Sequence, residues 1–212
     1  ARRPRNRLLA GTQPYSHSDF LLFSGKGLDT ISQCELKESF YTLREDLQRM
    51  AAAAYVAELY DLLIEEGEKN EGLFFLLLST LHLLTDGEDI DLALRYFELR
   101  FLSLLGYQPQ LTQCVHCGGP IEGRALRFSG QLGGVLCPDC WGQDGRAVSL
   151  CQGTLEMLKR FLTMTPRTLR VLGAAPAVRR ELERVLRICL EYRLPRELKS
   201  RRFLALVQGE GF

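Results

Sequence analysis

The spacing of apolar positions changes near residue 35 and predicts an extended segment followed by a long helix. In residues 1–33, short apolar runs are separated by Gly11, Gly25 and other turn residues, which is typical of strands joined by tight turns. From Leu36 to Leu63, apolar residues recur at steps of three and four, which is typical of an amphipathic helix. Gly67 is the expected end of that helix.

The same periodicity predicts five further helices in the rest of the chain. Asn70 can cap the first of them, because a side-chain oxygen at this position accepts a free N–H group of the first turn. Strands followed by helices place the chain in the α+β class, and short connections between helices predict a bundle. We expect these helices over residues 70–84, 89–105, 153–163, 177–192 and 196–207.

Two Cys-x-x-Cys pairs predict a structural zinc site. Cys114 and Cys117 form the first pair, and Cys137 and Cys140 form the second after 19 intervening residues. Four thiolates at this spacing can surround one tetrahedral Zn²⁺ and leave no position open for water or substrate. The apolar residues between the pairs predict a short hairpin around the turn at Gly133. The metal is therefore expected to stabilise the fold and to take no part in catalysis.

Other uses of these cysteines remain open. Two disulfides would suit a secreted chain, but the total of seven cysteines is odd and the other three are scattered. A zinc hydrolase would keep one metal position open, and His116 or Cys151 would then have to replace one of the four thiolates. Free thiols together with a thiolate metal site favour a reducing cytoplasm.

The cysteine-rich segment interrupts the helices and divides the chain into four parts. Its two ends are expected to lie on the same surface of the bundle, so that the metal ties together the helices on either side. Two or three strands cannot close a sheet core by themselves, and we expect further strands upstream. The parts are the terminal strands of a β-domain at 1–33, a helical bundle at 34–108, a zinc module at 109–146 and the remaining helices at 147–212.

Charge is distributed unevenly along the chain. The formal net charge is only +1, but residues 35–98 carry 15 acidic and 5 basic side chains. Residues 1–7 hold four arginines, and residues 179–202 hold 9 basic and 4 acidic side chains. An acidic middle with basic ends suggests a polyanion-binding surface formed by the two ends together. Alternatively, the arginines pair with acids on their own helices.

Other functional motifs are missing from the sequence. It contains no phosphate-binding glycine loop, no Gly-x-Ser-x-Gly and no His-Glu-x-x-His. We therefore expect the chain not to be an enzyme. No apolar run is long enough for a transmembrane helix, and no membrane partner is expected. Tyr15, Phe20 and Phe23 lie in the strand region, where such residues either stack on bases or fill a barrel core.

The order of short motifs resembles the RecO family of bacterial recombination mediator and DNA repair proteins. The resemblance spans the whole chain. Each motif alone is modestly specific, but their order together is quite specific. The matching motifs are ARRPRNRL at 1–8, QPYS at 13–16, LDTI at 28–31, RYFELR at 95–100, LLGY at 104–107, the four-cysteine module and LKSRRFL at 198–204.

This resemblance implies a fold and a set of partners. It implies an N-terminal OB-fold β-barrel, of which only the later strands fit in residues 1–33, and an all-α domain with an inserted zinc module. The resemblance therefore implies that the front of the barrel is missing from this sequence. The implied activities are binding of single- and double-stranded DNA, annealing, and help in loading a recombinase onto coated strands. The implied partners are RecR and the acidic C-terminal tail of single-strand-binding protein, at a cytoplasmic, nucleoid-associated location.

A non-catalytic, electrostatic mechanism fits these expectations, because arginines that neutralise phosphates let two strands approach each other. Such binding should be independent of base sequence. The alternative is a helical adaptor, held together by zinc, that binds only protein partners. The candidate DNA-binding residues are Arg2, Arg3, Arg5 and Arg7 at the front, and Arg179, Arg180, Arg201 and Arg202 at the back.

Overall fold

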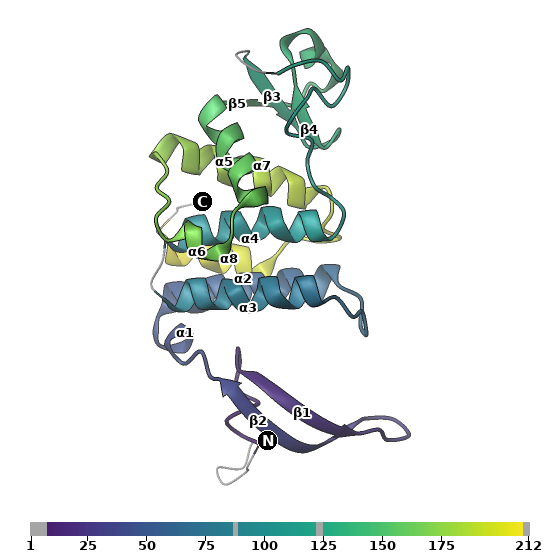
Figure 1. The fold of residues 1–212 in the computed structure, drawn as a ribbon, viewed down its shortest axis with the longest axis vertical. Helices are drawn as coiled ribbons and strands as arrows, with labels where there is room; N and C mark the ends of the chain where they lie inside the picture. Colours follow the sequence, from purple (N-terminus) through teal and green to yellow (C-terminus); the bar gives the residue numbers. More distant parts are fainter. Residues whose placement is uncertain (1–7, 87–88, 122–124, 210–212) are drawn as a thin grey trace.

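The computed structural model describes residues 8–86, 89–121 and 125–209, and the α+β class is confirmed. A two-stranded hairpin lies at one end of a helical bundle, and a small three-stranded sheet lies at the other end (Figure 1). The described helices are α1 Thr42–Glu45, α2 Leu47–Leu63, α3 Glu71–Thr85, α4 Ile90–Leu104, α5 Gln152–Thr163, α6 Pro166–Leu169, α7 Pro176–Glu191 and α8 Lys199–Val207, with a 3₁₀ helix, η1, at Pro138–Gln143.

The N-terminal hairpin pairs β1 (His17–Phe23) with β2 (Thr30–Glu38) in antiparallel register. Phe23 is 65% exposed and Leu28 is 92% exposed, so apolar side chains of this hairpin face solvent. The described residues show no closed barrel around it. The apolar run at Leu8 forms a turn and not a strand, since the Thr12 N–H donates to the Leu8 carbonyl at 3.1 Å.

The predicted start of the long helix at Leu36 is wrong. Leu36 pairs with Ser18 in the hairpin, and β2 continues to Glu38 because cross-strand hydrogen bonds outweigh the local helical pattern. Phe40 then adopts a left-handed backbone angle (φ 43°), which redirects the chain into α1. Asp46 has an extended backbone that separates α1 from α2. The boundary predicted at 33/34 therefore falls inside a strand.

Helix limits elsewhere follow local capping. Asn70 accepts the Leu73 N–H at 3.0 Å, and Asp89 accepts the Leu92 N–H at 3.1 Å, so both act as N-caps. At the end of α4, Gly106 has a φ of 83° and lets the Tyr107 N–H turn back to the Leu102 carbonyl at 2.8 Å. This is a Schellman cap, and it needs the left-handed angle that glycine adopts without strain.

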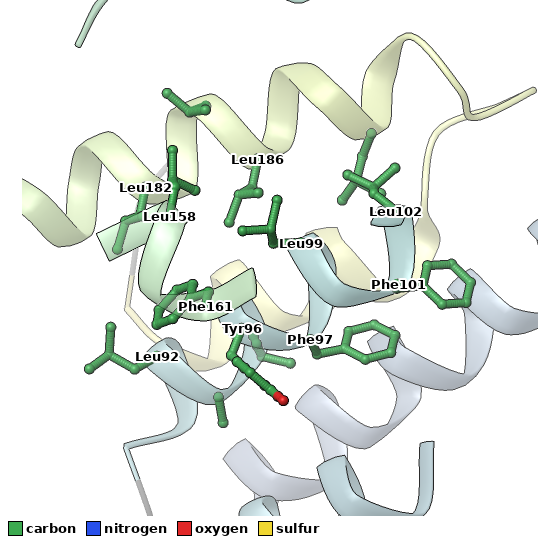
Figure 2. Packing of buried hydrophobic residues seen from close by; sticks show 14 of the residues in the cluster. Leu92, Tyr96, Phe97, Leu99, Phe101, Leu102, Leu158, Phe161, Leu182 and Leu186 are labelled. Atoms are coloured by element: carbon green, nitrogen blue, oxygen red, sulfur yellow. The ribbon is translucent and has the colours of Figure 1, made fainter. Parts of the chain in front are cut away.

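Helix α4 forms the centre of the bundle. It packs against α3, α5 and α7, and α2 packs against α8. Tyr96 of α4 meets Phe161 of α5 edge to face, with ring centroids 5.9 Å apart. Figure 2 shows the leucine side chains of α4 and α7, among them Leu99 and Leu186, directed toward each other. No described helix is both long and apolar enough to cross a membrane.

Helix α8 is held to α2 by a carboxylate. Glu58 of α2 accepts the N–H groups of Lys199 and Ser200 at 3.2 and 2.8 Å, and so satisfies free donors at the N-terminus of α8. Burial opposes ionisation of Glu58, but the hydrogen bonds from Ser200 and Lys199 and the charge of Arg196 outweigh it and lower the pKa of Glu58.

Replacing Glu58 with alanine is expected to destabilise the protein by about 1–2 kcal/mol, because the donors of α8 lose their acceptor. Since the folded pKa is lowered, the stabilisation is present above the ordinary carboxyl pKa of about 4.3 and is lost as the pH falls through the lower folded value. Thermal unfolding at several pH values measures both effects. Glu66→Ala, at an exposed carboxylate beyond α2, is the matched control.

Candidate metal centre and nucleic-acid interface

The four predicted ligands lie together in the structure. The Sγ atoms of Cys114, Cys117, Cys137 and Cys140 all lie within 4.8 Å of one another, and Cys117 Sγ is 3.8 Å from Cys137 Sγ. A tetrahedron with Zn–S bonds of about 2.3 Å has S···S edges of about 3.8 Å. A disulfide would need about 2.05 Å, and all seven cysteines are free. The donor set therefore fits a four-sulfur site for Zn²⁺.

Backbone geometry of the first cysteine pair points N–H groups at sulfur. The Gly119 N–H donates to Cys117 Sγ at 3.4 Å, and the Cys137 N–H donates to Cys114 Sγ at 3.5 Å. Gly118 supplies the left-handed turn, with a φ of 69°. Such N–H groups stabilise the thiolate form that a metal requires.

The same contacts set the pKa values of the thiols. Burial opposes ionisation of Cys114, but N–H groups of Cys117, Cys137 and His116 outweigh it and lower its pKa to about 6. Burial, together with the neighbouring thiols, raises the pKa of Cys140 to about 12. The Cys114 thiolate therefore forms readily, while a cation would offset the crowding that raises the pKa of Cys140.

The alternative ligands lie outside this cluster. His116 is exposed between the first two cysteines, and it does not belong to the group of converging donor atoms. Cys151 is the N-cap of α5, where its sulfur accepts the Thr154 N–H at 3.4 Å. Neither side chain replaces a thiolate, so the geometry favours a closed site.

The metal module, which comprises the zinc module predicted at 109–146 together with β5, has one more strand than the sequence indicated. β3 (Leu126–Ser129) pairs with β4 (Gly134–Leu136), as expected for the hairpin, and also with β5 (Val148–Leu150) on its other edge. The predicted limit at 146 therefore cuts off a strand of the module. The strand escaped notice because three residues are too few for an alternating pattern.

The module rests on α7. The Arg184 Nη2 donates to the Ser149 carbonyl of β5 at 2.9 Å, and the turn at Gly130 meets Ile188 and Tyr192. A Cβ on Gly130 would lie 2.2 Å from Ile188 Cγ2 and 2.7 Å from Tyr192 Cε2. Only glycine permits this close approach.

Replacing Gly130 with valine is expected to destabilise the protein by about 1–3 kcal/mol, because the added side chain pushes the turn away from α7. Zinc should remain bound, since no ligand is altered. Calorimetry with metal analysis measures both quantities. Gly142→Val, in the same module but with open space around its Cβ position, is the control. Equal losses in the two variants would contradict the proposed contact.

The front arginines predicted to bind DNA, Arg2, Arg3, Arg5 and Arg7, lie outside the described residues. Of the strand aromatics, Phe20 and Phe23 project from the exposed hairpin, whereas Tyr15 is half-buried beside the bundle.

Among the candidate DNA-binding arginines of the C-terminal part, Arg179 forms an ion pair. Both of its Nη atoms contact the Asp89 carboxylate, and Nη1 also lies 3.5 Å from Asp91. The Asp89 contact raises the pKa of Arg179 and lowers that of Asp89. A phosphate contact would compete with this link between α7 and α4, so Arg179 is less available to DNA than the sequence suggested. The sequence did not reveal this ion pair, because Asp89 lies 90 positions before Arg179.

Arg201 and Arg202 line a groove of about 810 Å³ between α7 and α8, and Arg180 is exposed near the start of α7. Arg201 lies 3.5 Å from Glu191. The groove is lined by five arginines and five carboxylates, so its charge is balanced. The sequence did not reveal this groove, because its walls and floor come from four separate segments.

The floor of the groove holds a buried polar network that sequence reasoning also missed. Arg95 donates to both oxygens of Glu98 at 2.9 and 2.8 Å, and Tyr55 donates to Glu98 at 2.6 Å. Burial raises the pKa of Glu98, while Arg95 and Tyr55 act in the opposite direction. The available signal was a pair of opposite charges, Arg95 and Glu98, three residues apart within a largely apolar helix.

Comparison with known proteins covers nearly the entire chain. The family model described as Recombination protein O N terminal matches residues 1–40, and the one described as Recombination protein O C terminal matches residues 44–202. A DNA repair protein RecO from Symbiobacterium thermophilum is 44% identical over 207 residues, which are 96% of this chain and 82% of the relative. Another from Pelotomaculum thermopropionicum is 45% identical over 202 residues, covering 95% and 78%. The chain therefore belongs to the RecO family.

Proposed function

We propose that this chain is a DNA repair and recombination mediator that binds DNA without catalysing a reaction. The observation that supports this most directly is the family match, which extends over both the N-terminal and the C-terminal parts of the chain. The relatives carry the name DNA repair protein RecO. The four-sulfur site agrees with a structural role for Zn²⁺, because it leaves no open metal position.

The proposed mechanism is neutralisation of phosphates by arginine. Contacts to single and double strands lower the repulsion between complementary strands, so that they anneal, and they do not read the bases. In the cytoplasm, at the nucleoid, the chain would assist loading of a recombinase onto coated single strands. Its protein partners in this proposal are RecR and the acidic tail of single-strand-binding protein. The proposed contacts are Arg2, Arg3, Arg5, Arg7, Arg180, Arg201 and Arg202.

The DNA affinity of the full chain is expected to fall steeply with salt. If about six phosphates are contacted, the slope of log affinity against log salt should be about −4 to −5. Arg201→Glu combined with Arg202→Glu should make the slope shallower by about 1 to 2, because two contacts are lost. Fluorescence anisotropy with oligonucleotides of unrelated sequence measures this slope.

The matched control replaces Arg160 and Arg167 with glutamate. Both arginines are exposed on α5 and α6 outside the groove. This pair changes the net charge equally and should change the slope less. An affinity that is insensitive to salt, or that depends strongly on sequence, would contradict the proposal.

A Co²⁺-substituted sample provides a separate test of the metal, since a spectrum other than that of four thiolates would support a hydrolase.

The groove supports a second candidate, an adaptor that binds only proteins. Its balanced charges and apolar side chains, such as Leu190 and Leu204, suit a peptide better than a uniform polyanion. A variant that reverses the charge of the four front arginines by replacing each with glutamate distinguishes the two functions. DNA binding should drop while an acidic peptide still binds the helical domain. An unaltered chain that binds the acidic peptide but no DNA would favour the adaptor.

A further inference from the structure

One ligand of the metal centre is open to solvent. Cys114 and Cys137 are each 1% exposed and Cys140 is 6% exposed, whereas Cys117 is an exposed residue. Open space surrounds the Cβ position of the following Gly118. A dissolved reagent can therefore approach the centre from the side of Cys117, while protein atoms cover the other three sulfurs.

A second sulfur lies within reach of this exposed one. Cys137 Sγ lies 3.8 Å from Cys117 Sγ, across the two cysteine pairs. Backbone hydrogen bonds hold the two pairs together, since the Val115 N–H donates to the Val135 carbonyl at 2.8 Å. The metal takes no part in this backbone hydrogen bond. The two sulfurs therefore stay close together when the metal is absent.

From these positions we infer that Cys117 is a modification site for hydroperoxides, and that its oxidation ends in a Cys117–Cys137 disulfide with loss of the metal ion. In the first step, Cys117 Sγ attacks a peroxide oxygen. An S–O bond forms, the O–O bond breaks, and hydroxide leaves, or alkoxide from an alkyl peroxide. Sulfur loses two electrons to the peroxide.

The second step closes the disulfide. Cys137 Sγ attacks the sulfur of the Cys117 sulfenic acid, an S–S bond forms, the S–O bond breaks and hydroxide leaves. Two thiolates and one hydrogen peroxide thus give one disulfide and two hydroxide ions, and an alkyl hydroperoxide gives one alkoxide and one hydroxide. Cys114 and Cys140 then remain as ligands, and two thiolates are too few for a tetrahedral zinc site.

The position of the disulfide has a structural consequence. It links the first cysteine pair to the segment that follows β4, so the oxidised module stays covalently joined where the metal joined it before. Oxidation should therefore release the ion without separating the two halves of the module. A disulfide within one Cys-x-x-Cys pair would leave them unlinked.

The test treats the zinc-loaded full chain with hydrogen peroxide. A chromophoric chelator follows zinc release, and mass spectrometry of peptides prepared without reduction locates the disulfide. We expect one equivalent of zinc to be released together with a Cys117–Cys137 linkage. A linkage between Cys114 and Cys117, or between Cys137 and Cys140, would overturn the inference.

Two variants sharpen this result. Cys117→His keeps a zinc ligand but has no sulfur to oxidise, so zinc release should slow about tenfold or more. Cys151→Ser removes an exposed cysteine outside the centre and should leave the rate unchanged. Release from Cys117→His at the unaltered rate would also overturn the inference. If this variant binds no zinc, the disulfide map of the unaltered chain still decides the matter.

Discussion

Replacing Cys137 with serine is expected to abolish zinc binding and to unfold the metal module. Cys137 is buried, and its sulfur lies beside the other three ligands. Structural zinc contributes roughly 10–16 kcal/mol of apparent binding free energy in isolated modules. This equals or exceeds the stability of a whole domain, which is about 5–15 kcal/mol. Without the metal, the three short strands depend on a small apolar cluster that includes Phe128 and Val135 and on the contact with α7, which are not expected to offset so large a loss.

Metal analysis and hydrogen exchange measure this outcome. Exchange should increase over β3, β4 and β5, while α2 and α3, which lie farther from the module, stay protected (Figure 1). A strong chelator added to the unaltered chain should reproduce the same pattern. Cys151→Ser is the control, because this cysteine caps α5 outside the cluster. A Cys137→Ser protein that retained a full equivalent of zinc would refute the assignment of this ligand.

Replacing Glu98 with alanine is expected to cost about 3–5 kcal/mol, because the Arg95 guanidinium would remain buried with most of its charge unpaired. Glu98 is fully buried and Arg95 is 8% exposed, so both charges are largely removed from water. Asp91 lies 3.3 Å from the Arg95 Nε and leaves the Nη1 atom, which now donates to Glu98, without that acceptor. Urea denaturation of the variant gives the change in the free energy of unfolding.

A double variant separates the ion pair from simple packing. Replacing Arg95 with methionine and Glu98 with leucine removes both charges and should recover much of the loss. Tyr55→Phe removes one hydrogen bond to Glu98 and should cost less than Glu98→Ala, about 1–3 kcal/mol. If the double variant were less stable than Glu98→Ala, the cost would lie in packing and not in an unpaired charge.

Local features of the sequence were sufficient to predict most helices and the clustering of the four cysteines. Asn70 and Gly106 mark helix limits because each acts on a backbone group within a few positions. The four cysteines are equally local, since each pair lies on one tight turn. Features of this kind depend little on the rest of the fold.

Features that depend on distant partners could not be predicted. The strand at Leu36 is extended because Ser18 pairs with it, and Arg179 is occupied because Asp89 lies next to it in space. The 810 Å³ groove exists only after α2, α4, α7 and α8 have come together. In each case the deciding partner lies far away along the chain, so pattern alone misassigned the residue or missed the feature.

The placement of the N-terminal hairpin and the metal module at opposite ends of the bundle has a practical consequence (Figure 1). Changes at sites that share no contacts usually add in their effect on stability. A reporter dye attached at the tip of the hairpin should therefore leave the zinc affinity unaltered. The helical bundle separates the two ends, so distance measurements between labels placed on them would report bending of the molecule.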